Sequence, residues 1–217
     1  RDPAAQATEH AQAIAAVIDD RGFPNFYGQQ RYGAQGDTAA LGFDLLSGRK
    51  STHDVEPKRR RFLLRLSLSA AQSAIFDRVL ANRIVDGLLH RVLPGAVMQV
   101  VASGGCFVAE DVESEQARFD ARETVVTGPM PGPRMKAAER SAGKREAAAL
   151  AEFGVDSASF ATFAKLTPGT RRPLVAWPAD FSIEPVPEGL WFRFSLPSGV
   201  YATTLLREFQ KPTSEPD

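Results

Sequence analysis

The feature that most constrains the fold is an apolar stripe along residues 67–92. Its members recur in pairs every three to four residues: Ile75/Phe76, Val79/Leu80, Ile84 and Leu88/Leu89. This is the period of one helix face, and a stripe of this length has to be buried against other elements. We predict one long core-facing helix to about Val92, with Ser67 or Ser69 capping its first turn and Pro94-Gly95 following its end.

Shorter helical and extended patterns surround this helix without a regular repeat. We predict further helices over residues 4–20, 37–47, 114–122, 136–153 and 200–209. Strands are predicted over residues 62–66, 96–102, 106–109, 124–127, 171–177 and 190–196. Residues 23–33 are predicted to form a rigid loop or a short extended piece. Stiff or polar loops are predicted over residues 47–61, 128–133 and the Pro-containing stretch before residue 190. Because no βαβ cadence is visible, the pattern favours an α+β fold over a doubly wound parallel sheet.

Length and composition indicate a globular protein of one large domain or two small ones. The chain has 217 residues, of which 43% are apolar, and no run approaches the roughly 18 apolar residues of a membrane helix. A single cysteine, Cys106, excludes an internal disulfide framework and a cysteine-based zinc site, and we expect it to be a small buried hydrophobe. The histidines share no metal-ligand spacing: His10, His53 and His90. We expect a cytoplasmic monomer without a metal or a membrane segment.

Charge is unevenly distributed along a chain whose net charge is zero. Residues 21–65 contain nine Lys or Arg and four acids, whereas residues 110–123 contain six acids and two arginines. A basic side opposite an acidic side is able to hold a phosphate backbone on one face. The alternative is that both runs are ordinary solvated surface.

Two stretches, one near each end of the chain, resemble a known family. Residues 22–33 read Gly-Phe-Pro-Asn-Phe-Tyr-Gly-Gln-Gln-Arg-Tyr-Gly, which resembles the signature G-x-P-N-[YF]-[FY]-G-x-Q-R-[FY]-G of the TruD family of tRNA pseudouridine synthases. Residues 196–208 read Leu-Pro-Ser-Gly-Val-Tyr-Ala-Thr-Thr-Leu-Leu-Arg-Glu, similar to the closing motif of that family. Weaker matches at residues 68–73, 127–132 and 171–174 fall between them in family order.

The resemblance implies a fold, a division into domains and an activity. It implies an α+β pseudouridine-synthase catalytic domain built from residues 1–49 and 171–217, with the family's insertion domain over residues 50–170. The implied reaction isomerises uridine 13 in the D-arm of tRNA without metal or cofactor. A base inside folded RNA has to be flipped out and stacked on an aromatic ring while its glycosidic bond is broken. A carboxylate is needed for that bond-breaking step.

The resemblance also implies roles for individual residues. Tyr27 falls where an active-site Phe usually sits and would stack on the uracil, while Asn25 would orient the base or the catalytic carboxylate. Phe26-Tyr27 replaces the commoner Tyr-Phe, which adds a hydroxyl that needs a partner. Gly28 would allow close approach to the ligand, and the expected contacts to RNA phosphates or carboxylates are Arg31, Arg59, Arg60, Arg61, Arg171 and Arg172. Arg207 and Glu208 would brace the wall of the active site.

Residue types alone allow a plainer interpretation of the first stretch, in which the aromatic side chains Phe26, Tyr27 and Tyr32 are core packing and Asn25 is a turn residue. The family's catalytic Asp belongs to a Gly-x-Lys-Asp type motif upstream, and nothing between Arg1 and Phe23 matches it. Asp19-Asp20 is predicted to be surface or capping sequence. We therefore expect a fragment of a synthase that is inactive alone. The alternatives are a non-catalytic tRNA-binding relative and an unrelated binding domain.

Overall fold

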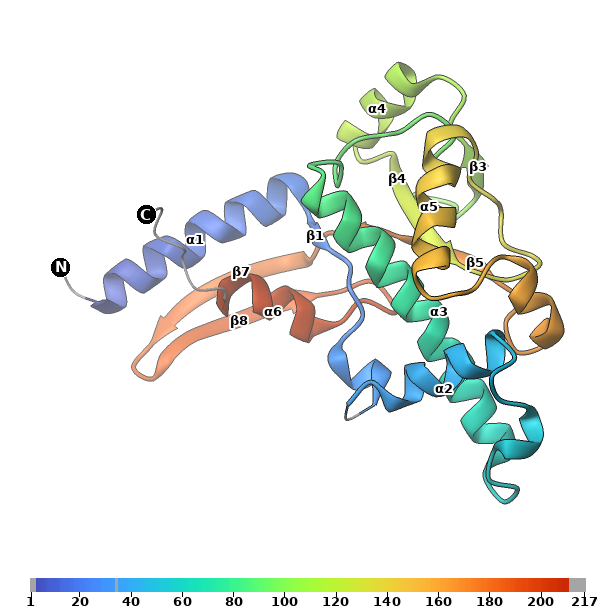
Figure 1. Ribbon diagram of the computed structural model, residues 1–217. Coiled ribbons are helices and arrows are strands. Elements are labelled where there is room, and N and C mark those ends of the chain that lie inside the picture. The colour runs from blue at the N-terminus through green and yellow to red at the C-terminus, as the bar shows by residue number, and fades with distance from the viewer. Residues whose placement is uncertain (1–2, 34, 211–217) are drawn as a thin grey trace. The chain divides into compact units, whose positions relative to one another are not determined.

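A computed structural model describes residues 3–33 and 35–210 of the chain (Figure 1). The chain forms two compact units. The terminal unit combines Arg1–Gly28 with Val175–Asp217, and the central unit is Gln29–Leu174. The predicted assignment of residues 1–49 and 171–217 to a catalytic domain, and of residues 50–170 to an insertion, concerns family relationship and stays a prediction.

In the residues that the structure describes, the terminal unit contains two helices, a short strand pair and a hairpin. Helix α1 (Pro3–Arg21) leads into β1 (Phe23–Pro24), which pairs antiparallel with β6 (Val175–Ala176). The antiparallel hairpin β7 (Ala179–Val186) and β8 (Gly189–Ser195) precedes helix α6 (Ala202–Gln210). Between α1 and β1, Gly22 has φ +70°, and a Cβ there would lie 2.5 Å from the Val175 side chain. Both the turn and the close approach of β6 therefore require glycine.

The core of the terminal unit joins segments from both ends of the sequence. Ile18 of α1, Phe23 of β1, Ala176 of β6 and Leu205 of α6 are buried together. Because Phe23 and Leu205 belong to the two signature stretches, this core holds the first half of one stretch and the closing stretch in the same unit.

The central unit packs helices on a four-stranded antiparallel sheet of order β3-β2-β4-β5. Its strands are β2 (Val97–Val100), β3 (Cys106–Val108), β4 (Thr124–Met130) and β5 (Thr170–Pro173). Its α-helices are α2 (Asp37–Leu46), α3 (Arg60–Val85), α4 (Val112–Asp120) and α5 (Arg140–Glu152). It also contains the 3₁₀ helices η1 (Gln29–Tyr32), η2 (Thr52–Asp54) and η3 (Ala158–Phe163).

Helix α3 is the long helix of the central unit and contacts α2, β4 and α5 (Figure 1). It packs along α2, where a Cβ on Gly42 would lie 2.2 Å from the Ser67 carbonyl oxygen, so glycine allows the two helices to approach. Further along, Phe76 of α3 and Leu174 close over Gly128 of β4. The α2–α3 core includes Phe43, Leu68 and Ile75, all buried. The packing of α3 on α2 and on β4 therefore fixes the position of the helix within the central unit.

The α+β prediction is confirmed, with antiparallel pairing in every sheet of the described residues. The predicted strand over residues 62–66 is wrong, because α3 already begins at Arg60 and runs through Ser67 and Ser69. The core stripe starts earlier than predicted, with Leu64, Leu68, Ala71 and Ile75 buried at helical spacing. It also ends earlier, since the helix stops at Val85 and Gly87 has φ +68°.

Two proline-containing segments predicted as loops are strands. Residues 128–130 continue β4, and Pro129 lies opposite Arg171. The stretch before residue 190 contains β7, an edge strand of a two-stranded sheet, where Pro185 is tolerated. Cys106 is half-buried rather than buried because β3 is also an edge strand. Within the described residues, no helix combines the length and apolar character that crossing a membrane requires.

Candidate functional site

The terminal unit brings an aromatic pair together from the two signature stretches. The Tyr27 and Tyr201 rings lie with centroids 5.8 Å apart and planes at 66°, an edge-to-face arrangement. Both side chains are half-buried. Tyr27 is therefore neither fully buried nor fully exposed, and its ring packs against the ring of Tyr201.

Local structure on both sides fixes this pair. The β1–β6 pairing holds Phe23 and Pro24, and the Phe26 amide donates to the Pro24 carbonyl at 3.0 Å, so the chain turns directly after the strand. Tyr201 immediately precedes α6, and its carbonyl accepts the Thr204 amide at 3.1 Å and the Thr204 hydroxyl at 2.6 Å. Tyr201 was not among the predicted site residues, although its aromatic position in the closing motif was a usable signal.

Asn25 lies in the same turn and is buried, with 2% of its surface exposed. A buried amide carries two donors and an acceptor with two lone pairs, which suits it to fix the geometry of a polar partner. Gly28, the last residue of the terminal unit, is buried as well. The predicted roles of Asn25, Tyr27 and Gly28 stay predictions.

The second half of the first signature docks on α3 in the central unit. The Arg31 guanidinium donates from Nε to the Ser73 hydroxyl at 3.1 Å and from Nη2 to the Ser69 hydroxyl at 2.5 Å. The Tyr32 hydroxyl donates to the Asp77 carboxylate. These bonds attach η1 to one face of α3, so Arg31 is positioned by serines inside the protein.

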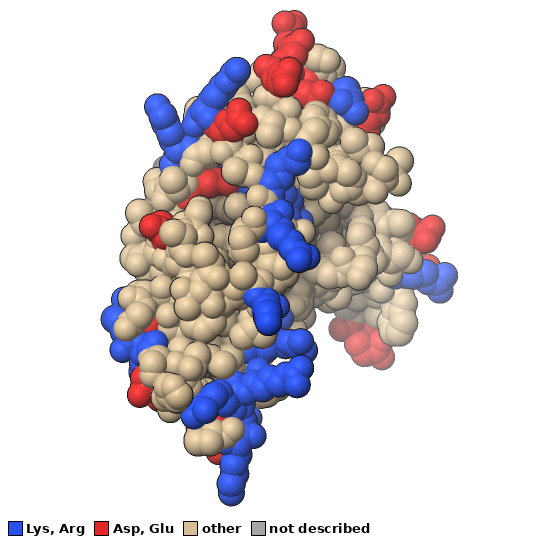
Figure 2. Space-filling model, turned by 90° about the vertical axis from the view of Figure 1, so that its right-hand side faces the viewer, with Lys and Arg blue, Asp and Glu red and all other residues tan. Residues whose placement is uncertain are grey.

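A basic segment lies at the beginning of α3. Arg59 and Arg61 are exposed, as are Lys58 and Arg65, and we call these four residues the basic segment. Arg59 lies over the ring of Phe62, with 5.9 Å between its guanidinium carbon and the ring centroid. Figure 2 shows Lys and Arg side chains gathered around this end of α3, and Asp and Glu side chains around α4.

Other cations of residues 21–65 form hydrogen bonds or ion pairs within the protein. Arg60 donates to the carbonyls of Val55 at 3.2 Å and His53 at 3.4 Å, so it closes the turn before α3. Arg49 and Lys50 pair with Asp44 at 2.8 and 3.2 Å. The hydrogen bond from Arg49, followed by that from Lys50, lowers the pKa of Asp44. The basic surplus of residues 21–65 is therefore concentrated in the basic segment.

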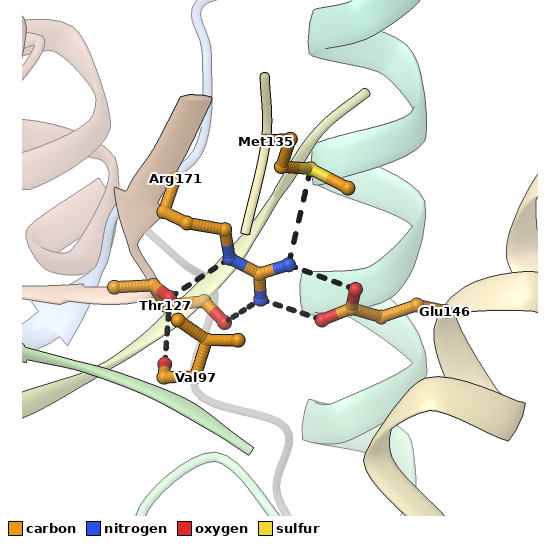
Figure 3. Close-up of polar contacts among 5 residues, drawn as sticks. All are labelled: Val97, Thr127, Met135, Glu146 and Arg171. Carbon is orange, nitrogen blue, oxygen red and sulfur yellow. Dashed lines mark hydrogen bonds and ion pairs between the residues drawn. The ribbon is translucent and has the colours of Figure 1, made fainter. Parts of the chain in front are cut away.

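Arg171 is part of the interior of the central unit rather than a surface cation (Figure 3). Its side chain is 2% exposed, and Nη1 and Nη2 donate to the two carboxylate oxygens of Glu146 at 2.9 and 2.6 Å. Nε and Nη2 also donate to the hydroxyl and carbonyl of Thr127 at 3.0 and 2.8 Å. With its donors directed inward, this guanidinium is a strut between β5, β4 and α5, and we withdraw it from the predicted phosphate contacts.

The remaining predicted site residues are exposed or half-buried. Arg172 is half-buried, with its guanidinium carbon 5.4 Å from the centroid of the Phe76 ring. Arg207 is exposed and Glu208 half-buried on α6. Neighbouring residues of a helix do not face each other, so any bracing by these two runs through separate partners and stays a prediction. Among the residues that the structure describes, no cluster of three or more His, Cys, Asp or Glu is placed to hold a metal ion.

Comparison with known proteins gives one consistent family. The model of the family TruD, tRNA pseudouridine synthase D, matches residues 1–54 and 58–209. The chain is 41% identical over 205 residues to tRNA pseudouridine synthase D of Anaeromyxobacter dehalogenans strain 2CP-C, covering 94% of this chain and 59% of the relative. It is 36% identical over 201 residues to a protein of the same name from Thermus thermophilus, covering 93% and 53%. The chain thus spans little more than half the length of these relatives.

The fold has a solved counterpart as well. A Methanosarcina mazei structure that carries the name tRNA pseudouridine synthase D superimposes with a TM-score of 0.75 at 22% sequence identity. The match covers 94% of this chain and 65% of the other. At this level of identity the likeness concerns the fold.

Proposed function

This chain belongs to the TruD family, and from that premise we propose that its protein isomerises a uridine of tRNA, in the D-arm, to pseudouridine. The observation that carries the proposal is the pairing of Tyr27 with Tyr201, which joins the two signature motifs of the family in one place. The substrate we propose is tRNA, which puts the activity in the cytoplasm. We further propose that the protein acts as a monomer and without a cofactor.

The turn at Asn25–Tyr27 suits the capture of a flipped base. An aromatic ring stabilises a stacked base by roughly 1–3 kcal/mol, and the edge-to-face contact with Tyr201 reduces the freedom that Tyr27 would lose on stacking. The Asn25 amide, buried in the same turn, has donor and acceptor groups of the kind that pair with a uracil edge or orient a carboxylate. We assign the carboxylate that acts at the glycosidic bond to no residue of this chain.

The exposed cations of the basic segment are the better candidates for contacts with the RNA backbone. Arg59 and Arg61 are exposed, whereas Arg60 donates to two backbone carbonyls. Cations that neutralise phosphates on binding release counterions, which supplies most of the sequence-independent affinity. Arg31 and Arg172 remain in the proposal as secondary contacts, since each already has a partner on α3.

Replacing Tyr27 tests the catalytic proposal directly. In the complete protein, Tyr27→Ala should lower pseudouridine formation about 5- to 150-fold, the equivalent of about 1–3 kcal/mol of lost stacking. Binding of tRNA should change far less, because the backbone contacts remain. Tyr27→Phe keeps the ring and should keep most of the turnover. The measurements are pseudouridine formation in a tRNA transcript and the Kd for that tRNA.

Two outcomes would contradict the proposal in different ways. Equal turnover in Tyr27→Ala and the parent would remove Tyr27 from the active site. A complete protein that binds tRNA but forms no pseudouridine would instead support the non-catalytic tRNA-binding alternative.

A further inference from the structure

A cavity of about 240 Å³ lies in the central unit between the end of α3, strand β4 and helix α5, and we call it the α3–α5 cavity. Its inner wall is formed by buried residues that include Arg83, Val126, Thr127 and Leu174. Val85, 86% exposed, also lines it, so the cavity opens to solvent at the end of α3. Thr127 and Glu146, which line its deep side, are drawn in Figure 3.

The inner wall contains an arginine whose hydrogen-bond donors have partners within the protein only in part. Arg83 is 5% exposed, and its Nη2 donates to the carbonyls of Leu88, at 2.8 Å, and Arg91. Its Nε is buried without a hydrogen-bond partner. A buried donor that lacks an acceptor is costly, so such a group commonly serves a ligand or a water molecule.

The acidic side chains of the cavity are already neutralised by other arginines. Glu146 is held by both terminal nitrogens of Arg171, and Asp86 pairs with Arg145 at the mouth. Burial, and after it the charge of Arg145, lowers the pKa of Arg83 to about 10, while Glu146 acts in the opposite sense. Arg83 therefore remains a cation at neutral pH. The lining contains two arginines and two carboxylates, and Arg171, which holds Glu146 from behind the wall, adds one further positive charge beside the cavity.

Most of the remaining lining is apolar. Val79, Ala96, Val126, Ala142 and Leu174 surround the charged groups, with Val85 at the rim. Small-molecule sites typically combine such apolar walls with a few polar groups that orient the ligand. We propose that the α3–α5 cavity binds a small organic anion, in which an apolar body fills the cavity and a carboxylate or phosphate head accepts hydrogen bonds from Arg83.

Binding of simple aromatic anions to the purified protein tests the proposal. Isothermal titration at constant ionic strength would compare benzoate and phenyl phosphate with neutral benzyl alcohol and with inorganic phosphate. Benzoate or phenyl phosphate should bind more tightly than either control, and the better of the two identifies the head group. Arg83→Gln should weaken that binding about tenfold or more, because a charged hydrogen bond is lost in a buried site.

Two further variants make the result decisive. Ala148 lines the mouth and is exposed, so Ala148→Phe should obstruct the cavity and weaken binding without lowering the Tm, even if Arg83→Gln does not fold. Arg118→Gln, on α4 outside the cavity, is the matched charge control and should bind like the parent. The proposal is overturned if neither anion binds, if benzyl alcohol binds as tightly as benzoate, or if Ala148→Phe binds like the parent. None of these results depends on pseudouridine formation, so the two proposals fail separately.

Discussion

Arg171 and Arg172 are adjacent on β5, yet the strand gives them different surroundings. Arg171 is buried against Thr127 and Glu146, whereas Arg172 is half-buried beside the ring of Phe76. The sequence presents them as one basic pair, and it does not reveal which side of β5 is covered by α5. The residue type therefore predicts that both side chains bind anions. For Arg171, the anion is the Glu146 carboxylate of the same protein.

Removing Arg171 should destabilise the central unit strongly. Arg171→Met leaves the Glu146 carboxylate without its bidentate partner in a buried site, which typically costs about 3–5 kcal/mol. The free energy of unfolding from urea titration measures this loss. Arg172→Met, the neighbouring control, removes a cation–π interaction and should cost about 0.5–1 kcal/mol. The double variant Arg171→Met/Glu146→Gln should lose less than the sum of its single changes, and strict additivity would show that the pair is not coupled.

The start of α3 shows where sequence patterns stop being informative. The run Phe62-Leu63-Leu64-Arg65-Leu66 fits a strand as well as a helix when it is read alone. Its helical state follows from the burial of Leu64 and Leu68 in one cluster with Phe43 of α2, which lies in another part of the sequence. The helices at residues 4–20, 37–47 and 136–153 were predicted well because each carries its own stripe or a glycine at its end. The closing motif marks Tyr201 as a candidate, but its contact with Tyr27 becomes visible only in the folded terminal unit.

Helix α3 begins with a sequence that disfavours a helix start. Arg59 is the N-cap residue without a side-chain hydrogen bond, and the first turn contains basic but no acidic residues. Positive charge at the positive end of the helix dipole is unfavourable, so Arg59→Asp should raise the free energy of unfolding by about 0.5–2 kcal/mol. Thermal or urea denaturation measures the gain. If the basic segment binds RNA, the same variant should bind tRNA more weakly.

Arg65→Asp separates these two effects. It changes the charge by the same amount but lies beyond the first turn, where it can neither cap the helix nor meet the strongest part of the dipole. It should therefore weaken tRNA binding without stabilising the fold. A stability gain as large as that of Arg59→Asp would rule out capping as the cause.

At the scale of the whole molecule the net charge is zero, but positive and negative side chains are separated within the central unit. The basic segment and the acids around α4 gather at different ends of it (Figure 2). Asp44 pairs with both Arg49 and Lys50 and offsets one of their two charges, so the exposed cations of the basic segment supply most of the positive potential of the basic side. An RNA backbone approaching this unit would be drawn to the start of α3 and repelled from α4, which orients the complex before any base is contacted.

Replacing the three arginines of the basic segment should therefore change the salt dependence of tRNA binding. In the complete protein, replacing Arg59, Arg61 and Arg65 together with Gln should weaken binding and reduce the slope of log K against log salt by about 0.7–0.9 for each phosphate that the variant no longer neutralises. The matched control replaces Lys136, Arg140 and Lys144, three exposed cations of the same unit, with Gln. Because both triple variants lose the same net charge, a general electrostatic effect would flatten both slopes equally and would place the basic segment away from RNA. A slope that changes only in the first variant would locate the phosphate-binding cations at the start of α3.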